Sequence, residues 1–484
     1  MQIRTGTAFL CALAACAVFV VQGYVFIRQV GPHEREVEFA ASFLEPKTAP
    51  LAPKALLYRS IFRDWPPDVR SLRIPALALG AGSLLLCFAF LTLTVGPAAA
   101  SLATLLLAAD SVWVVSSVVD FQASVVPRFL WSATLVAAVG FRRTQWRWLL
   151  GTAGFAAGLA IWDRPAYVWV VLAWLLGGVV FFRSAFRERL TRVNAAVGLF
   201  WLAVGMAPLL RPSHFSEWAR IWEVRLPFPW WKALDGSGLF GFLAGIPVGP
   251  PAYGDTAWER TAIFLSGLAG HPEHHLLLVL MVASLASLAV PRGRAGFRVI
   301  GFCAATAVLC VEPWPLPQMM VATTLAALPR PRWAMAAGLA AVAAGMLVTL
   351  ECYSRIVRFG PAVAFTDAAF PLREALAHAR TPGIFTVDPG IIGPMRFLGR
   401  GALPLRIVDS FWEERDPDLA RKRIDTLFHP PHLAVLYADR RNGDSRLFER
   451  LMTEVRVRHL REDLVEEIRD SHGRRVYRLV RYVE

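Results

Sequence analysis

Arginines in this chain gather in alternate short connections between long apolar segments. One set of connections holds four groups of them, within residues 142–147, 183–192, 292–298 and 330–332. The connections in between are poor in basic residues and carry Asp120, the Asp163-Arg164 pair and Glu312. Short loops rich in Lys and Arg stay in the cytoplasm, because their translocation is disfavoured. This alternation predicts a multi-pass membrane protein, with the first set of loops inside and the second outside.

The segments between these loops are apolar, as expected of membrane-spanning helices. A helix needs roughly 20 apolar residues to cross the hydrocarbon core. We place spans near residues 7–27, 74–94, 97–117, 121–140, 148–162, 166–182, 194–210, 275–290, 297–312, 316–328 and 333–350. With the N-terminus inside, this odd number of spans puts the C-terminus outside. The chain is expected in a bacterial-type inner (plasma) membrane, N-terminus cytoplasmic and C-terminal domain extracytoplasmic.

Three external segments are too long to be simple connectors. They are residues 28–73, residues 211–274 and the stretch that follows Leu350. We therefore divide the chain into a transmembrane domain, residues 1–350, and a soluble extracytoplasmic domain, residues 351–484. Because these long polar segments all lie on the external side of the membrane, we expect the functional site of the protein on that side.

The segment after residue 350 alternates between helical and extended patterns. Helices are predicted at 370–380, 418–428 and 445–455, strands at 383–388, 405–409 and 432–438, and a closing hairpin turning at 470–473. Such alternation indicates a small α/β domain, which either caps the membrane domain or takes part in acceptor binding. The predicted fold class is thus an α-helical polytopic membrane domain of about 11 transmembrane helices with a C-terminal extracytoplasmic α/β domain.

The composition favours a membrane protein and argues against nucleic-acid binding. Hydrophobic residues make up 55% of the chain and charged residues 18%, and there are 17 tryptophans. The formal net charge of +14 is explained mostly by positive inner loops and by anchoring at the membrane surface. No nucleic-acid-binding motif accompanies that charge. Membrane lipids, and no nucleic acid, are therefore the expected partners.

The first outer loop holds three carboxylates within five residues, Glu34, Glu36 and Glu38. Carboxylates this close repel one another, which can raise the pKa of one of them toward that of a useful base. In a helix, Glu34 and Glu38 would share a face, whereas in an extended segment all three would align. A solvated acidic loop without a catalytic role is the alternative interpretation.

Four short segments add context to this acidic loop. In chain order they are residues 35–40 (REVEFA), 71–77 (SLRIPAL), 105–111 (LLLAADS) and 158–165 (GLAIWDRP). Together they resemble motifs of the GT-C superfamily of integral-membrane glycosyltransferases, of the aminoarabinose-transferase and protein-mannosyltransferase kind. The resemblance covers about residues 1–210 well and the later spans only through topology. Arg35 stands where the family has Asp, so that either Glu36 or Glu34 does the work of that residue or the chain has lost that chemistry.

This resemblance implies transfer of a sugar from a polyprenyl-phosphate-linked donor to a lipid, glycan or protein acceptor on the outer face. A carboxylate, Glu36 or Glu34, would take the acceptor proton, while cationic groups stabilise charge on the departing phosphate. Arg164 is the first candidate cation, because the family often has Lys there; Asp163 could instead simply pair with it. The alternative function is a non-catalytic GT-C-like scaffold or a lipid or glycan transporter.

Three more residues are candidates for the same site. Arg73, in the second segment, would bind the lipid phosphate or support the site. Arg128 follows Pro127 near the outer part of the fourth span, although it could merely snorkel outward. Asp120 lies between the third and fourth spans, where the family often places polar site residues, and a helix N-cap is its alternative role.

The second long outer loop contains the one cluster of histidines in the sequence. His271, Glu273 and His274 could bind a divalent metal ion together with Glu34 or Glu36, and a metal would disperse phosphate charge. The cluster matches no fixed ligand spacing, so a polar collar before the next span is the alternative. Tryptophans and basic residues within 218–232 indicate a segment that lies in the membrane interface.

Overall fold

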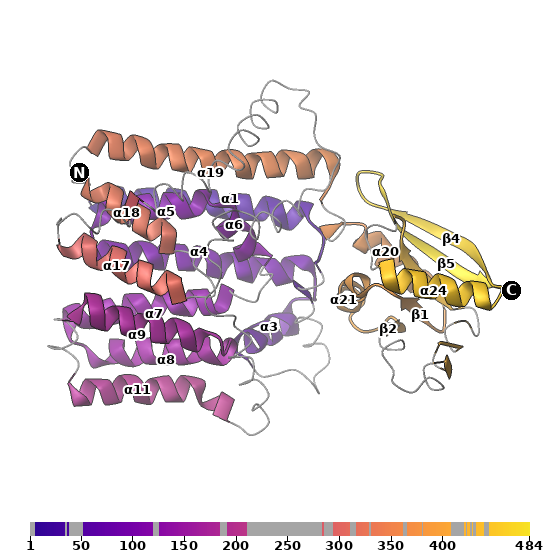
Figure 1. Ribbon diagram of the computed structural model, residues 1–484, viewed down its shortest axis with the longest axis horizontal. Coiled ribbons are helices and arrows are strands. Elements are labelled where there is room, and N and C mark those ends of the chain that lie inside the picture. Colours follow the sequence, from indigo (N-terminus) through magenta and orange to yellow (C-terminus); the bar gives the residue numbers. More distant parts are fainter. Residues whose placement is uncertain are drawn as a thin grey trace.

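A helical bundle and a smaller α/β domain follow one another along the long axis of the molecule in the computed structural model (Figure 1). The structure describes residues 5–33, 36–37, 52–119, 125–183, 191–210, 283–284, 294–309, 316–328, 331–361, 365–379, 381–407, 421–422, 424–425, 428, 432–439 and 445–484. Following the predicted topology, we call the end of the bundle next to the α/β domain the outer end and the opposite end the inner end.

The bundle is built from apolar helices that run along its length (Figure 1). Those described are α1 (Thr5–Gln29), α4 (Val69–Thr94), α5 (Pro97–Ala109), α6 (Ser111–Val118), α7 (Val125–Thr144), α8 (Arg147–Asp163), α9 (Tyr167–Phe181), α11 (Arg192–Met206), α17 (Arg294–Leu309), α18 (Leu316–Ala327) and α19 (Pro331–Phe359). A short helix, α3 (Pro53–Asp64), lies at the outer end.

Four stretches of the described chain are long and apolar enough to cross a membrane. They are Thr5–Gln29, Val69–Thr94, Val125–Thr144 and Arg192–Leu209. Other apolar helices, such as Pro97–Ala109 and Tyr167–Phe181, are shorter. A multi-pass membrane protein is thus supported, while the predicted number of spans is not established, and the span expected at 275–290 lies largely outside the described residues.

The third predicted span, 97–117, is not one continuous helix. The chain leaves the helical conformation at Asp110, with φ −76° and ψ 112°, and α5 ends before this residue while α6 begins after it. Asp110 caps α6, because its side chain accepts a hydrogen bond from the backbone N–H of Trp113 at 2.8 Å. The prediction of an uninterrupted span was wrong because apolarity alone does not reveal a capping aspartate.

Glycines let α8 and α11 touch through their backbones. A methyl group on Gly154 would collide with the carbonyl oxygen of Gly198, and one on Gly158 with that of Leu202. In a bilayer, helices gain little from burying apolar surface against each other, so close backbone contact at small residues is a main source of attraction. This contact attaches α11 to the bundle.

The α/β domain contains one five-stranded sheet. Its elements are α20 (Ala369–His378), β1 (Ile384–Thr386), α21 (Pro389–Leu398), β2 (Leu405–Ile407), β3 (Leu433–Tyr437), α24 (Ser445–Val457), β4 (Arg461–Arg469) and β5 (Arg475–Val483). The strand order is β2-β1-β3-β5-β4. Strands β1, β2 and β3 are parallel, whereas β5 is antiparallel to both β3 and β4.

Most of the elements predicted after residue 350 are confirmed. The strands, the first and last helices and the closing hairpin all occur, while the helix predicted at 418–428 falls largely outside the described residues. Helix α21 was not predicted, because Pro394 and two glycines obscure its pattern; Asp388 caps it by accepting from the N–H of Gly390 at 3.0 Å. Helix α19 continues past residue 350, where the sequence placed the end of a span.

Candidate functional site

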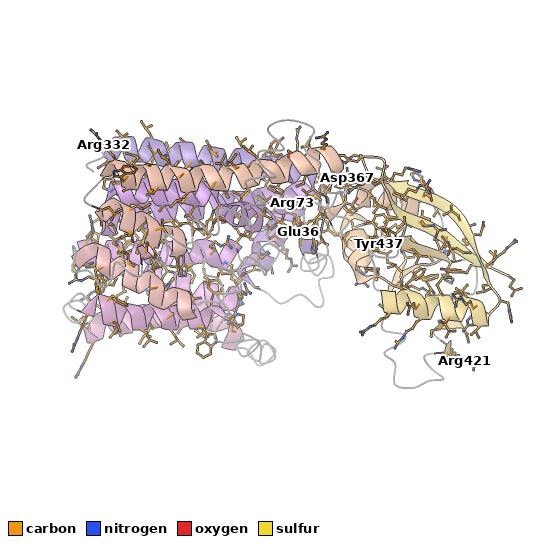
Figure 2. All side chains as sticks on the ribbon, turned by 45° about the horizontal axis from the view of Figure 1, so that its top comes forward. Glu36, Arg73, Arg332, Asp367, Arg421 and Tyr437 are labelled. Carbon is orange, nitrogen blue, oxygen red and sulfur yellow. The ribbon has the colours of Figure 1, made fainter. Side chains whose placement is uncertain are left out.

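A buried ion pair joins the first outer loop to the start of α4. Arg73 donates from Nε to Oε1 of Glu36 at 2.6 Å and from Nη2 to Oε2 at 2.7 Å. The exposed fraction is 0% for the Arg73 side chain and 1% for that of Glu36. Figure 2 shows the two residues at the outer end, beside the α/β domain. Among the predicted site residues that the structure describes, Arg73 and Glu36 are the two in direct contact.

The guanidinium of Arg73 also holds the end of the first helix. It donates to the carbonyl oxygens of Val30 and Gly31, each at 2.7 Å. The position of Arg73 follows from local sequence, because Asp68 and Ser71 form a capping box that starts α4 just before it. Both oxygens of the Glu36 carboxylate are therefore engaged by one arginine, an arrangement suited to positioning the loop.

The same loop is packed into the α/β domain. Val37 is fully buried in a hydrophobic cluster with Leu372 and Ile384 of that domain and with Tyr58 and Leu72 from the outer end of the bundle. Residues from both parts of the chain thus share one core. The α/β domain is held against the outer end by this core and is not a loosely attached cap.

A backbone contact reinforces this attachment. The N–H of Gly31 donates to the carbonyl oxygen of Phe365 at 2.7 Å, and the His33 ring lies 4.4 Å from the Phe365 ring, centroid to centroid. Any side chain at Gly31 would collide with the backbone of Thr366. The approach is therefore possible only with glycine at this position.

Helix α3 connects this ion pair to the outer end of α8. The N–H of Lys54, in the first turn of α3, donates to Oδ1 of Asp163 at 2.6 Å. One turn later, the hydroxyl of Tyr58 donates to the carbonyl oxygen of Leu72 at 2.7 Å, next to Arg73. The sequence left open whether Asp163 pairs with Arg164; in the structure it bonds to the start of α3.

Two cationic side chains lie where α3 meets α8. Lys54 is buried, with Nζ 5.9 Å from the centre of the Tyr58 ring. Arg164 is partly exposed, but its Nη1 atom is buried and has no hydrogen-bond partner among the described residues. A buried guanidinium nitrogen without an acceptor is costly. Lys54 was not singled out from the sequence, because nothing in its local pattern distinguishes it from a surface lysine.

Arg128 is buried within the bundle and does not snorkel outward. Its Nη1 donates to the hydroxyls of Ser116 and Ser117 at 3.2 and 3.1 Å, and its guanidinium lies 4.5 Å from the centre of the Trp113 ring. Such cation–π contacts are stronger when desolvated. Arg128 thus holds α6 against α7. Helix α6 is the part of the third predicted span that follows the break at Asp110.

Asp110, part of one motif but given no role from the sequence, joins three helices. Its Oδ1 caps α6, and its Oδ2 accepts from Nε2 of Gln318 on α18 at 2.7 Å. A polar pair between segments so distant along the chain has no local signature. The acidic residue in the third motif was the one signal that could have drawn attention to it.

The remaining candidates lie outside the described residues. These are Glu34, Asp120, His271, Glu273 and His274. Within the residues that the structure does describe, no group of three or more His, Cys, Asp or Glu side chains could hold a metal ion. The metal site predicted around His271 therefore stays a prediction.

Comparison with known proteins identifies the fold. No protein-family model and no curated protein matches the chain. Among solved structures, it is similar to the oligosaccharyltransferase of Archaeoglobus fulgidus in complex with zinc and sulfate, with a TM-score of 0.50 and 10% identity over 86% of this chain and 67% of the other. The protein has a GT-C fold.

Further structures of that archaeal enzyme match this chain with lower scores. One, named AglB and in complex with an inhibitory peptide and a dolichol-phosphate, has a TM-score of 0.47 and 9% identity over 87% of this chain and 69% of the other. Another, tethered with an acceptor peptide, has a TM-score of 0.49 and 10% identity over 88% and 69%. At 10% identity, the likeness to the zinc and sulfate complex establishes the fold of this chain and no residue's role.

Proposed function

We propose that this chain is a membrane glycosyltransferase of the hexosyltransferase type. It would move a sugar from a polyprenyl-phosphate-linked donor to a lipid, glycan or protein acceptor on the outer face of an inner membrane. The support is the GT-C fold, shared with an oligosaccharyltransferase, and the cationic groups gathered where α3 meets α8 at the outer end.

The observation that carries this proposal is the environment of Arg164. Its buried Nη1 atom lacks an acceptor among the described residues, and a buried hydrogen-bond donor without an acceptor is costly. A phosphate oxygen of the donor lipid would supply that acceptor through a charge-assisted hydrogen bond. Lys54, buried next to the same junction, would add positive charge.

The chemistry needs one bond made, one bond broken and one proton moved. The acceptor oxygen would bond to the anomeric carbon of the sugar, while the bond from that carbon to the phosphate oxygen breaks and the lipid phosphate leaves. Arg164 would stabilise the charge that grows on the phosphate. A carboxylate would accept the proton of the acceptor hydroxyl.

Glu36 was predicted as that base, and its ion pair with Arg73 favours a different role. Both of its oxygens accept hydrogen bonds from Arg73, and one also accepts from the N–H of His33 at 3.3 Å. We therefore assign Glu36 and Arg73 to positioning of the first outer loop. Glu34 and Asp120 stay as the proposed proton acceptors.

A divalent metal at His271, Glu273 and His274 is a further part of the proposal. Imidazole and carboxylate groups suit such an ion, and a bound metal would disperse phosphate charge. No step above depends on it. Loss of donor binding on treatment with a chelator, restored by one added divalent metal, would support this site; full binding in the chelator would exclude it.

The test measures donor binding to the purified, full-length protein in detergent. With a synthetic polyprenyl-phospho-hexose as probe, Arg164→Ala should weaken binding at least about tenfold, as expected when one charge-assisted hydrogen bond is removed. Arg164→Lys should retain part of the binding, because a cation remains. Arg147→Ala, which changes an exposed arginine at the opposite end of the same helix, is the matched control and should bind as the wild type does.

Two results would contradict parts of this proposal, one the enzymatic function and the other the role of Arg164. If folded wild-type protein binds no polyprenyl phosphate, the function fails and the scaffold alternative replaces it. If it binds the donor but Arg164→Ala binds equally well, the assignment of Arg164 fails while the function stands. A melting curve for each variant separates these outcomes from unfolding, since Arg164 adjoins Asp163, which bonds to the start of α3.

A further inference from the structure

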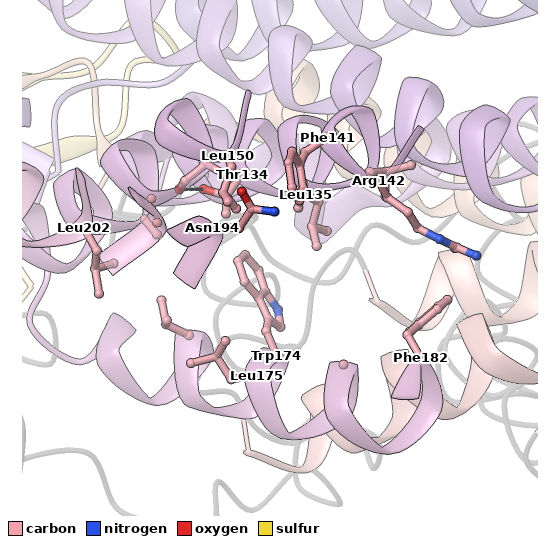
Figure 3. Close-up of a pocket in the computed structure, with 18 of the residues that line it drawn as sticks. Thr134, Leu135, Phe141, Arg142, Leu150, Trp174, Leu175, Phe182, Asn194 and Leu202 are labelled. Atoms are coloured by element: carbon pink, nitrogen blue, oxygen red, sulfur yellow. Dashed lines mark hydrogen bonds between the residues drawn. The ribbon is translucent and has the colours of Figure 1, made fainter. Parts of the chain in front are cut away.

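An apolar pocket of about 430 Å³ opens in the bundle near its inner end, far from the proposed donor site. Figure 3 shows part of its lining. The walls come from α4, α7, α8, α9, α11 and α17. Its volume is within the range of about 300 to 1,000 Å³ that ligand pockets have.

The walls of this pocket are almost entirely hydrocarbon. Leu135 and Trp174 line its middle, and Leu202 lies at the end opposite Arg142 (Figure 3). The Trp174 ring packs against the Trp131 ring, 5.2 Å away between centroids. Ala138 and Leu199 line the pocket and are exposed, so that the pocket is open to the surroundings of the bundle.

Positive charge stands at one end of the pocket. Arg142 is exposed and lines the pocket, with its guanidinium 5.9 Å from the centre of the Phe182 ring. Arg143, in the last turn of α7, and Arg147, the first residue of α8, are exposed beside it. This end therefore attracts an anionic group while the remainder of the pocket attracts hydrocarbon.

Two tryptophans place this end of the pocket at the membrane surface. Trp146 and Trp148 are 58% and 61% exposed, and their rings lie 6.1 Å apart between centroids. Exposed tryptophans next to arginines are typical of the level of lipid headgroups. An anionic headgroup at Arg142 would thus stand at its natural depth, with its chain directed into the bilayer.

We propose that this pocket binds one acyl chain of an anionic phospholipid, with the headgroup phosphate at Arg142. An unfilled pocket in a bilayer would leave its walls without dispersion contacts, and an acyl chain restores them. The charge of Arg142 then selects anionic over neutral headgroups. This site is separate from the donor site proposed at Arg164, which lies at the opposite end of α8.

The test is lipid binding by the delipidated full-length protein, followed by native mass spectrometry. Phosphatidylglycerol and phosphatidylcholine with identical chains are the probes. Wild type should show one site that prefers phosphatidylglycerol at least about tenfold. Ala138→Phe, which fills the pocket, should abolish that site. Ala14→Phe, the same change at an exposed alanine of α1, is the control and should leave it intact.

Further variants separate headgroup from chain recognition. Arg142→Ala should reduce phosphatidylglycerol binding to the level of phosphatidylcholine, whereas Arg70→Ala, at an exposed arginine of α4 at the outer end, should keep the preference, because Arg70 does not line the pocket. If Ala138→Phe does not fold, Ala195→Phe on α11 repeats the test from another wall. Equal phosphatidylglycerol binding by wild type and a folded filling variant overturns the proposal. So does displacement of the phospholipid by equimolar polyprenyl phosphate, which would make the pocket part of the donor site.

Discussion

Arg73 and Glu36 form a bidentate, buried ion pair where the bundle meets the α/β domain. The two residues are 37 positions apart in the sequence. The same arginine holds the end of α1 through the carbonyl groups of Val30 and Gly31. The residue after Glu36, Val37, is buried in the core shared with the α/β domain. One side chain thus organises three segments of the chain.

Breaking this ion pair should destabilise the protein strongly. Arg73→Ala leaves a buried carboxylate without its partner, which typically costs about 3–5 kcal/mol. The expected result is a clearly lower melting temperature of the detergent-purified protein. Arg70→Ala, which changes an exposed arginine one turn earlier in α4, is the control. The double variant Glu36→Gln/Arg73→Gln should be destabilised less than the two single changes together, because no unpaired charge remains; strict additivity would contradict a coupled pair.

The three glutamates of the first outer loop should differ in activity. Glu36→Gln should abolish sugar transfer by misplacing the loop and should lower the melting temperature as well. Glu34→Gln should abolish transfer and leave the melting temperature unchanged, as expected of a base that contacts the acceptor. Glu38→Gln should cost little, since the resemblance gives the role of the acidic residue to Glu36 or Glu34 and not to Glu38. Full activity in both Glu34→Gln and Glu36→Gln would remove any catalytic role of this loop.

The α/β domain should lie outside the cytoplasm. With Arg142, Arg143, Arg147 and further arginines at the inner end, the positive-inside rule directs the opposite end outward. Figure 2 shows Arg332 at the end far from Asp367 and the sheet. Alkaline phosphatase fused after Glu484 should be active, and a fluorescent protein that folds only in the cytoplasm should be dark. Inactive alkaline phosphatase together with a fluorescent fusion would place the α/β domain in the cytoplasm and contradict the predicted topology.

Stability at alkaline pH should depend on Tyr477. Burial raises the pKa of this phenol above its ordinary value, and the negative charge of Asp388 raises it further. Because the phenol ionises first in the unfolded chain, its contribution to stability is complete below about pH 10 and falls as the pH rises toward the folded-state pKa. The free energy of unfolding of Tyr477→Phe should therefore decrease less than that of the wild type between about pH 9 and about pH 11, a range around the ordinary phenol pKa.

The control for this measurement is Tyr24→Phe, which changes an exposed tyrosine of α1. Its free energy of unfolding should decrease with rising alkaline pH as steeply as that of the wild type. If the free energy of unfolding of Tyr477→Phe decreases with pH as steeply as that of the wild type, another group dominates the alkaline decrease in stability.

Sequence alone determined the class of protein and most of its helices. Long apolar segments are a local property, because each helix satisfies its own backbone hydrogen bonds. The side of the membrane on which each loop lies stays a prediction from the placement of arginines. The elements of the α/β domain could be predicted for the same reason: turn residues, alternation and caps such as Asp388 act within a few positions. Arg73 and Glu36 were also found, but in separate motifs and with separate roles.

Tertiary structure decided how these pieces meet. The pairing of Glu36 with Arg73, of Asp163 with the N–H of Lys54 and of Asp110 with Gln318 joins residues that are far apart in sequence. Such contacts depend on the packing of whole helices, and a single sequence carries no signal for them. They show both oxygens of Glu36 engaged by Arg73, which is the basis for the positioning role proposed above, and an Nη1 atom of Arg164 that is buried without a hydrogen-bond partner among the described residues. The sequence could name charged residues, but only the fold determines which charges neutralise each other and which stay available for a ligand.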